Sequence, residues 1–368
     1  MEINENGIYA IKLSQVKNLG QITLKKLVDV FGNYKNIVNA SIDELTEKGG
    51  VKKELAKNIV NVRNDLYLKE IEKIIKKERV KLLLYGTDEF PDSLANIYYT
   101  PCVLYYKGEY KKEDYNAIAI VGSRVAINYS KKITEEIVSE LAARRVTIVS
   151  GLARGIDTIA HWSAIKNKGR TIAVLGSGLN CIYPPENKRL AEEIAEKGML
   201  ISEYPLNIKA SAKNFPFRNR IISGLSLATI VMQAAVKSGA LITAYFALEQ
   251  GKEVFALPYE ITSKYGKGCN ELIKRGAYLF ENIIDIFNNV NFKREYLCER
   301  QAEQKREERE IRLNKEEEEL MKFLEERKSV EEIVNYLQKS INEISIILLK
   351  LEMKGLIRKL AGNYYQSI

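Results

Sequence analysis

Between residues 80 and 257 the sequence alternates short apolar runs, rich in β-branched residues, with segments of helical periodicity. The apolar runs are 80–85, 102–106, 117–121, 146–149, 171–175, 199–202, 228–231 and 253–257. The helical segments between them include 130–144, 186–197 and 240–250. This alternation predicts an α/β fold in which a parallel sheet is covered by helices on both faces and binds ligands at the carboxyl ends of its strands.

A small helical domain, residues 1–75, is predicted ahead of the sheet domain, residues 76–290. Within 13–27 and 49–60, a glycine comes directly before an apolar helical pattern, as in helix-hairpin-helix and SAM-like folds. Such hairpins often bind a DNA phosphate through backbone amides, whereas small helical bundles use the same turns for packing. With a net charge of +2 in residues 1–75, the sequence leaves both roles open.

The segment after the sheet domain, residues 291–313, is a mixed-charge run that predicts a linker. Residues 314–368 then show three helical patterns followed by a short hairpin pattern, which is the order of a winged-helix domain. Two of the helices open with capping-box pairs, Ser329 with Glu332 and Ser340 with Glu343.

This winged-helix-like segment lacks the charge expected of a DNA reader. Residues 311–368 have a net charge of zero, and the third helical pattern is apolar where a groove-reading helix is polar and basic. We therefore expect the segment to contact protein or to serve packing alone.

Positive charge is concentrated in the sheet domain, where residues 76–290 carry +7 of the chain's +9. A basic domain attracts polyanions such as nucleic acids by releasing their counterions.

No stretch approaches the roughly 18 uninterrupted apolar residues of a membrane span, and the N-terminus lacks the basic-then-apolar order of a signal peptide. The sequence thus predicts a cytoplasmic protein without a membrane partner.

The residues needed for several common cofactors and catalytic sites are scarce. The four cysteines are far apart without a Cys-x-x-Cys pair, and His161 is the single histidine. These counts argue against a zinc site, a disulfide framework and a Ser-His-Asp triad. Neither the dinucleotide fingerprint nor the phosphate loop of ATP-binding proteins occurs, so we expect no metal and no cofactor.

Glycine-rich turns follow four of the predicted strands. They are Gly122-Ser123-Arg124, the stretch 150–157 with Gly151, Arg154 and Gly155, Gly176-Ser177-Gly178, and the stretch 238–243 that opens with Ser238 and Gly239. Glycine lets a backbone approach a ligand, and amides at a helix start bind phosphate oxygens. We expect these turns to form a rim at the carboxyl edge that follows several phosphates, with Arg124 and Arg154 adding positive charge.

The stretch 215–226, Phe-Pro-Phe-Arg-Asn-Arg-Ile-Ile-Ser-Gly-Leu-Ser, combines two arginines with an aromatic residue where a loop enters a helix. Arg218 and Arg220 supply guanidinium groups for phosphates at a helix start, and Phe215, next to Pro216, offers a flat face for a base. This combination is typical of single-stranded nucleic-acid sites. The alternative is an ordinary helix start with surface arginines and a core phenylalanine.

Possible acids and bases do not form a convincing catalytic set. Asp157 and His161 lie four residues apart on a predicted helix, so they are either a proton-transfer pair or a structural Asp with a His packed behind it. Glu203 and Glu249 are candidate acids without a visible partner. We predict no catalytic residue.

Taken in order, the motifs at 122–124, 150–157, 176–187, 202–205, 215–222 and 238–244 resemble the DNA processing protein A family, also called Smf. The resemblance covers about residues 80 to 285. It implies a non-enzymatic protein with an extended Rossmann-like fold that binds single-stranded DNA, forms a homodimer and loads the RecA recombinase in natural transformation or recombination.

In that family the arginine of Gly-Ser-Arg and the Phe-Pro-x-Arg-Asn-Arg segment line the DNA pocket, with the asparagine ordering the loop. A lysine just before the aromatic residue has its counterpart in Lys213. The residues that we expect to contact DNA are Gly122, Ser123, Arg124, Gly151, Arg154, Gly155, Lys213, Phe215, Arg218, Asn219, Arg220, Ser238 and Gly239.

The chain departs from the family pattern at several positions: Asn180, Asn207, Ala210, Gln233 and Tyr259. Gln233 stands where the family often has a glutamate, which argues further against catalysis.

Two other functions remain as alternatives. Nucleotide phosphoribohydrolases of the lysine-decarboxylase-like group have a related sheet and a Pro-Gly-Gly-x-Gly-Thr-x-x-Glu motif, which is replaced here by 237–243 with Glu249 displaced. A scaffold whose DNA affinity is incidental is the third possibility.

Overall fold

The computed structural model describes residues 5–62, 74, 77–293, 295, 315–353, 356–360 and 364–367. The chain divides into two compact units, Met1–Cys298 and Glu299–Ile368, and each contains hydrophobic core clusters of its own. Most of the predicted linker 291–313 lies outside the described residues. Among the helices in these ranges, none is long and apolar enough to cross a membrane.

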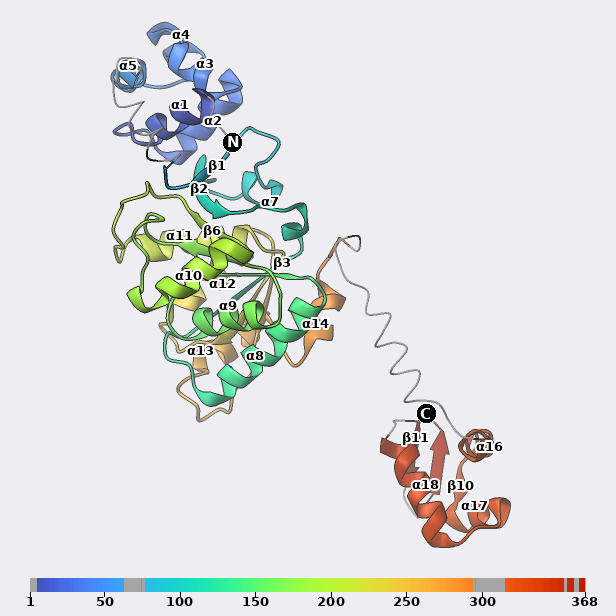
Figure 1. Ribbon diagram of the computed structural model, residues 1–368. Helices are drawn as coiled ribbons and strands as arrows, with labels where there is room; N and C mark the ends of the chain where they lie inside the picture. Colours follow the sequence, from blue (N-terminus) through green and yellow to red (C-terminus); the bar gives the residue numbers. More distant parts are fainter. Residues whose placement is uncertain are drawn as a thin grey trace. The chain divides into compact units, whose positions relative to one another are not determined.

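The first unit is built on a nine-stranded sheet with the strand order β1-β2-β6-β5-β4-β3-β7-β8-β9. Strands β1, β2, β3 and β6 are labelled in Figure 1. Eight of the strands fall on the apolar runs named above, and only β9 was not predicted. The strands are β1 (Lys81–Leu84), β2 (Val103–Gly108), β3 (Ala117–Gly122), β4 (Thr147–Ser150), β5 (Thr171–Leu175), β6 (Met199–Ser202), β7 (Ala228–Gln233), β8 (Glu253–Ala256) and β9 (Tyr278–Leu279).

The strands β6, β5, β4, β3, β7, β8 and β9 are parallel to one another, as predicted. Strand β2, by contrast, runs antiparallel to both β1 and β6. The prediction of a parallel sheet is therefore wrong for the β1–β2 end. A parallel crossover needs a dozen or more residues, usually with a full helix. The connection from β1 to β2 contains only the four-residue helix α7 (Asp92–Ala95), and 3-10 helix η2 (Lys112–Tyr115) leads from β2 to β3.

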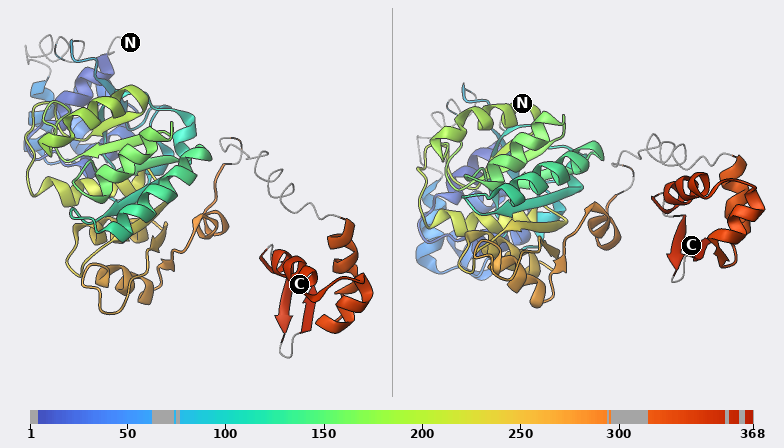
Figure 2. Two further views of the ribbon diagram at one scale, coloured as in Figure 1. Left: turned by 60° about the horizontal axis from the view of Figure 1, so that its bottom comes forward. Right: turned by 90° about the horizontal axis from the view of Figure 1, so that it is seen from below.

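Helices cover both faces of the sheet, as predicted (Figures 1 and 2). Helices α8, α9 and α14 pack on one face through the core that contains Ile118 and Ile230, and α11, α12 and α13 pack on the other through the core that contains Val121 and Val231. The helices, with the 3-10 helix η3, are α8 (Asn128–Ala143), α9 (Ile156–Lys166), η3 (Pro185–Asn187), α10 (Lys188–Lys197), α11 (Asn214–Gly224), α12 (Gly239–Glu249), α13 (Lys267–Lys274) and α14 (Ile283–Asn289).

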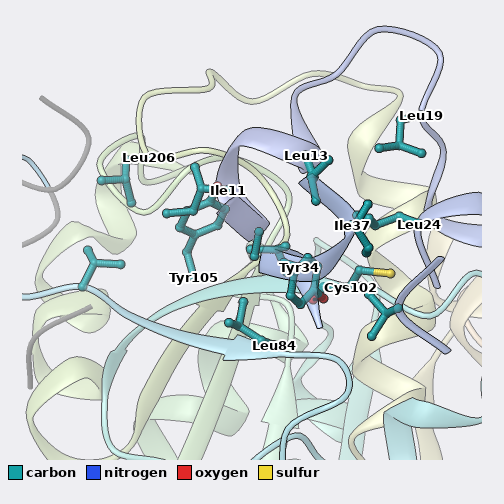
Figure 3. Close-up of a cluster of buried hydrophobic side chains, with 14 of the residues drawn as sticks. Ile11, Leu13, Leu19, Leu24, Tyr34, Ile37, Leu84, Cys102, Tyr105 and Leu206 are labelled. Atoms are coloured by element: carbon teal, nitrogen blue, oxygen red, sulfur yellow. Dashed lines mark hydrogen bonds between the residues drawn. The ribbon is translucent and has the colours of Figure 1, made fainter. Parts of the chain in front are cut away.

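The N-terminal segment is helical, and its cluster of buried side chains continues into the β1–β2 end of the sheet (Figure 3). Gly20 precedes α2 and Gly49-Gly50 precede α5, which is the arrangement of helix pairs joined by glycine turns that the sequence predicts. Tyr34 Oη donates to the Cys102 carbonyl at 2.6 Å, so a buried hydrogen bond also joins the two parts. The helices are α1 (Glu5–Ser14), α2 (Gln21–Phe31), α3 (Tyr34–Asn39), α4 (Ile42–Glu47) and α5 (Lys53–Asn61).

In the described residues 315–353, 356–360 and 364–367, the second unit has three helices and a three-stranded sheet of order β10-β12-β11, in which β11 and β12 form the predicted hairpin. Both predicted capping boxes have their hydrogen bonds, with Glu332 N donating to Ser329 Oγ at 3.2 Å and Glu343 N to Ser340 Oγ at 3.4 Å. The elements are α16 (Lys315–Phe323), β10 (Lys328–Ser329), α17 (Val330–Leu337), α18 (Ile341–Met353), β11 (Ile357–Leu360) and β12 (Tyr364–Ser367).

The apolar helix α18 packs its Ile344, Leu348 and Leu351 into the core of this unit. Ile341, Ile346 and Leu349 remain more than half exposed. The exposed face of α18 thus mixes these apolar side chains with Glu343, Lys350 and Glu352 and is not the basic surface of a DNA-reading helix. Protein contact or packing alone stays our prediction for this unit.

Candidate nucleic-acid interface

Strand β3 marks the point at which the strand order of the sheet reverses. It pairs with β4 on one side and with β7 on the other, because the chain builds the sheet outward from β3 to β6 and then returns to add β7 to β9. In open α/β sheets, ligands bind in the crevice outside the carboxyl ends of the strands at such a switch point.

A pocket of about 790 Å³ lies at this switch point. The end of β3, the loop after β7 and the first turns of α11 and α12 form its walls. Its cationic lining residues are Arg124, Arg218 and Lys237, its acidic one is Asp157, and its aromatic ones are Tyr183 and Phe215.

Arg124 and Phe215 meet at the mouth of this pocket. The exposed Arg124 guanidinium lies 5.7 Å from the centre of the half-buried Phe215 ring, and the centre of the Tyr183 ring lies 5.6 Å from that of Phe215. A Cβ atom at Gly176 would come within 2.7 Å of the Phe215 ring, so glycine is needed there for the ring to occupy its position. The predicted combination of a cation with an aromatic face therefore exists in the fold.

Gln233 holds the loop that carries Arg124. Its side-chain oxygen accepts from Ile127 N at 3.0 Å and from Ser130 Oγ at 2.5 Å, and its amide nitrogen donates to the Val125 carbonyl at 3.0 Å. All three bonds use a neutral amide that both donates and accepts, which a glutamate carboxylate cannot do. The departure at Gln233 thus has a structural role beside the pocket.

Arg218 lines the pocket but is 4% exposed. Its Nη1 donates to the Gly151 carbonyl at 2.7 Å and also to the Val174 carbonyl, and its Nε contacts Asn219 Oδ1 at 3.2 Å. Burial lowers the pKa of Arg218 to about 10, against the opposing effect of Asp157, so the guanidinium stays charged at neutral pH. Arg218 therefore places a fixed positive charge in the wall of the pocket.

Arg220 is not brought into this pocket. It is 1% exposed, forms an ion pair with Glu203 at 2.5 Å and lies over the Phe217 ring at 3.8 Å. Helix α11 begins at Asn214, earlier than the sequence suggested, so Arg218 and Arg220 lie in its second turn and project to different sides. Glu203, for which the sequence showed no partner, is thus paired with an arginine that we expected to bind DNA.

Two of the predicted rim glycines, Gly151 and Gly155, pack against other parts of the protein. Gly151 N donates to Asp157 Oδ2 at 3.1 Å, and a Cβ atom on Gly151 would lie 2.6 Å from the Arg218 guanidinium. Gly155 has φ of +74°, and a Cβ atom there would lie 2.2 Å from the Ser123 carbonyl oxygen. These glycines let the loops pack closely together, while Gly122, Ser123, Ser238 and Gly239 do line the pocket.

The remaining predicted residues lie around the pocket. Arg154 is exposed, pairs with Glu186 and lines a smaller neighbouring pocket with Tyr183 and Phe215. Lys213 is exposed just before α11, and Asn219 Nδ2 donates to the Gly239 carbonyl at 3.4 Å, which ties α11 to the start of α12.

Two lining residues, Lys237 and Tyr183, were not among the predicted contacts. Lys237 is exposed directly before Ser238, the N-cap of α12. A lysine between the end of a strand and the start of a helix is visible in the sequence and could have been predicted as a contact. Tyr183 lies far from Phe215 in the sequence, and only the fold brings the two rings together.

Asp157 and His161 have separate partners, which favours the structural alternative. The Asp157 carboxylate accepts from the Gly151 and Ala153 amides, and His161 Nδ1 lies 2.7 Å from Thr171 Oγ1. Burial raises the pKa of Asp157 to about 6 and lowers the pKa of His161 to about 3.

Across the described part of the chain, no group of three or more His, Cys, Asp or Glu residues is arranged to hold a metal.

Comparison with known proteins identifies relatives of this chain. The model of the family described as DNA recombination-mediator protein A matches residues 81–291, and that of the DprA winged helix domain matches residues 304–363. Protein Smf of Synechocystis sp. is 40% identical over 278 residues, which are 74% of this chain and 70% of that protein. DNA processing protein DprA of Bacillus subtilis is 42% identical over 216 residues, 58% of this chain and 73% of the relative.

Two solved structures share the fold. The X-ray structure of DNA processing protein A from Streptococcus pneumoniae has a TM-score of 0.68 and 32% identity, covering 80% of this chain and 100% of that one. A structure of DNA processing protein A from Helicobacter pylori, described for its single-stranded DNA binding mode, has a TM-score of 0.52 and 33% identity, covering 57% and 94%. The predicted family and fold class are thereby confirmed.

Proposed function

Because the chain belongs to the DNA recombination-mediator protein A family, we propose that it binds single-stranded DNA in the pocket at the carboxyl edge of the sheet and delivers that DNA to the RecA recombinase. The observation that carries this proposal is the exposed Arg124 guanidinium beside the half-buried ring of Phe215. The single-strand binding described for the Helicobacter pylori relative supports it.

Phosphates of the strand are bound by the exposed cations of the pocket. Arg124 and Lys237 lie on the loops after β3 and β7, and α12 begins just after Lys237 with its positive dipole end at Gly239, which also lines the pocket. Arg218 adds a charge that is already desolvated and fixed. Lys213 does not line this pocket, and Arg154 lines the smaller neighbouring one. DNA contacts of both residues are also part of the proposal.

A base stacks on Phe215, which selects single-stranded over duplex DNA, because the bases of a duplex already stack on each other. Base–aromatic stacking contributes about 1–3 kcal/mol per base and is tolerant of sequence. We therefore expect little sequence preference.

We propose a homodimer with one pocket in each copy, acting in the cytoplasm in natural transformation or general recombination. The edge strand β9 exposes Tyr278 and Leu279, which offer a surface for a second copy. Sedimentation equilibrium of the wild type and of a Leu279→Glu variant tests this surface.

The proposed function includes no catalytic step. Glu249, the acid nearest in sequence to the hydrolase motif, is exposed at the far end of α12, about 15 Å of helix rise from Gly239. Release of free base from a nucleoside monophosphate would contradict this assignment and favour the phosphoribohydrolase alternative.

The test is fluorescence anisotropy of labelled oligo-dT and of a duplex of equal length, over a salt series. We expect tight, salt-dependent binding to the single strand, and a loss of about tenfold to a hundredfold in both Arg124→Ala and Phe215→Ala. Only Arg124→Ala should also flatten the salt dependence, because it removes a phosphate contact. The matched control is Arg275→Ala, on an exposed arginine that pairs with Glu271 at the end of α13.

Equal, weak binding to both forms of DNA that neither variant changes would overturn the proposal. Delivery to RecA is tested separately, by whether the wild type shortens the lag of RecA assembly on DNA coated with single-strand binding protein while Arg124→Ala does not.

A further inference from the structure

Three aromatic rings form a row next to the pocket, on the opposite side of the first turn of α11. The Tyr98 and Tyr99 ring centres are 4.4 Å apart, and those of Tyr99 and Phe217 are 5.8 Å apart, both in edge-to-face geometry. Tyr98 is 72% exposed and Tyr99 41% exposed, which is unusual for such large apolar groups.

The antiparallel strand β2 brings this row to the same edge of the sheet as the pocket. Tyr105, near the start of β2, pairs with Ser202 at the carboxyl end of β6. The residues that lead into β2, including Tyr98 and Tyr99, therefore lie at the carboxyl edge. A parallel β2 would have left them at the opposite edge.

The buried ion pair of Arg220 and Glu203 holds Tyr99 in place. Tyr99 has φ of +57°, a left-handed backbone conformation that is rare for a bulky residue and occurs where surrounding contacts hold it. Its carbonyl accepts from Arg220 Nε at 3.0 Å, and Arg220 is itself held by Glu203. The same guanidinium lies over the Phe217 ring, so one buried arginine positions both Tyr99 and Phe217.

Phe215 and Phe217 relate this row to the pocket. They lie two residues apart in the first turn of α11 and so project to opposite sides of it. Pro216 between them is exposed and lines the pocket, and Lys213 is exposed just before the helix. A strand passing from one ring to the other crosses the amino-terminal end of α11, where the helix dipole favours phosphate.

We propose that Tyr98 and Tyr99 form a second base-stacking platform for the single strand whose first base stacks on Phe215. This inference rests on the proposed function and extends its footprint across α11. Nucleic acid fits the platform better than a protein partner, because the rings continue the row of aromatic groups from the pocket and residues 76–290 carry a net charge of +7.

The test is the binding of oligo-dT from about 4 to about 16 nucleotides, the range of known single-strand site sizes, to wild type and Tyr98→Ala. The shortest oligonucleotides, which fill the pocket alone, should bind both proteins equally. Longer ones should bind Tyr98→Ala about tenfold to a hundredfold more weakly, the loss expected for one stacked base. Tyr98→Phe should bind like the wild type, because it keeps the ring.

Tyr115→Ala is the matched control, since Tyr115 is a surface tyrosine at the amino end of β3, on the opposite edge of the sheet. Photocrosslinking of 5-iododeoxyuridine placed along the oligonucleotide should give an adduct on Tyr98 or Tyr99 in the wild type. Thermal unfolding of Tyr98→Ala should match the wild type, because the side chain is exposed.

The two proposals fail in different ways. If Arg124→Ala weakens binding but Tyr98→Ala matches the wild type at every length and no adduct forms, the platform is overturned while the pocket stands. If Arg124→Ala has no effect or the wild type does not bind single strands, the proposed function and the platform fall together.

Discussion

The loop after β3 and helix α11 both bring arginine to the carboxyl edge of the sheet, with opposite results. Arg124 on the loop is exposed beside an aromatic ring, whereas Arg218 and Arg220 on the helix are almost fully buried. The same residue type thus offers its charge to a ligand in one region and holds the fold together in the other.

The difference follows from the energy of burying a charge. A buried guanidinium must be compensated by hydrogen bonds and an opposite charge. The segments packed against α11 provide these, through the Gly151 and Val174 carbonyls for Arg218 and through Glu203 for Arg220. An exposed guanidinium keeps its water and can exchange it for phosphate. Substitutions in the two regions should therefore affect different measurements.

The largest effect is expected for Arg220→Ala. It leaves Glu203 buried without its cation and frees the carbonyl of Tyr99, so the free energy of unfolding should fall by about 3–5 kcal/mol in urea titration. The double variant Glu203→Leu/Arg220→Met should recover most of that loss, because it removes both charges. A loss below about 1 kcal/mol for Arg220→Ala would mean that the pair does not support the fold.

A smaller effect is expected from acid, through His161. Its pKa of about 3 in the fold lies below the value of 6.5 in the unfolded chain, because of burial first and of the Arg218 charge second. The unfolded state therefore binds more protons between these values, and stability is lost as pH falls below 6.5, at about 1.4 kcal/mol per pH unit.

At pH 5 this contribution amounts to about 2 kcal/mol, which the His161→Gln variant should lack. The measurement is urea unfolding of both proteins at pH 7 and pH 5. An equal loss of stability in the two proteins would show that His161 does not titrate as a buried neutral group.

The smallest effect is expected for Arg154→Ala. The Arg154–Glu186 pair is about half exposed on both sides, and such surface pairs contribute little to stability. The melting temperature should stay within experimental error of the wild type, while any role of Arg154 in DNA binding would appear only in the anisotropy assay. A clear drop in melting temperature would place Arg154 with the α11 arginines instead.

Sequence reasoning predicted Arg124, Phe215 and the rim positions Ser238 and Gly239, and these do line one pocket. Their residue types follow strand ends and helix starts, which are local features of the chain. It did not predict that Arg220 is buried against Glu203. That pairing depends on where α11 begins and on how the helix is rotated against its neighbours.

The sequence by itself determined the number and order of most strands and helices, the position of the glycine turns and the basic character of the sheet domain, because periodicity, turn chemistry and charge are local properties. Only the tertiary structure decided that β2 runs antiparallel, which arginines reach solvent and that Tyr98 lies at the edge that holds the pocket. These features depend on burial and on contacts between segments far apart in the chain. The residue pattern of a single segment does not show which distant segment will pack against it.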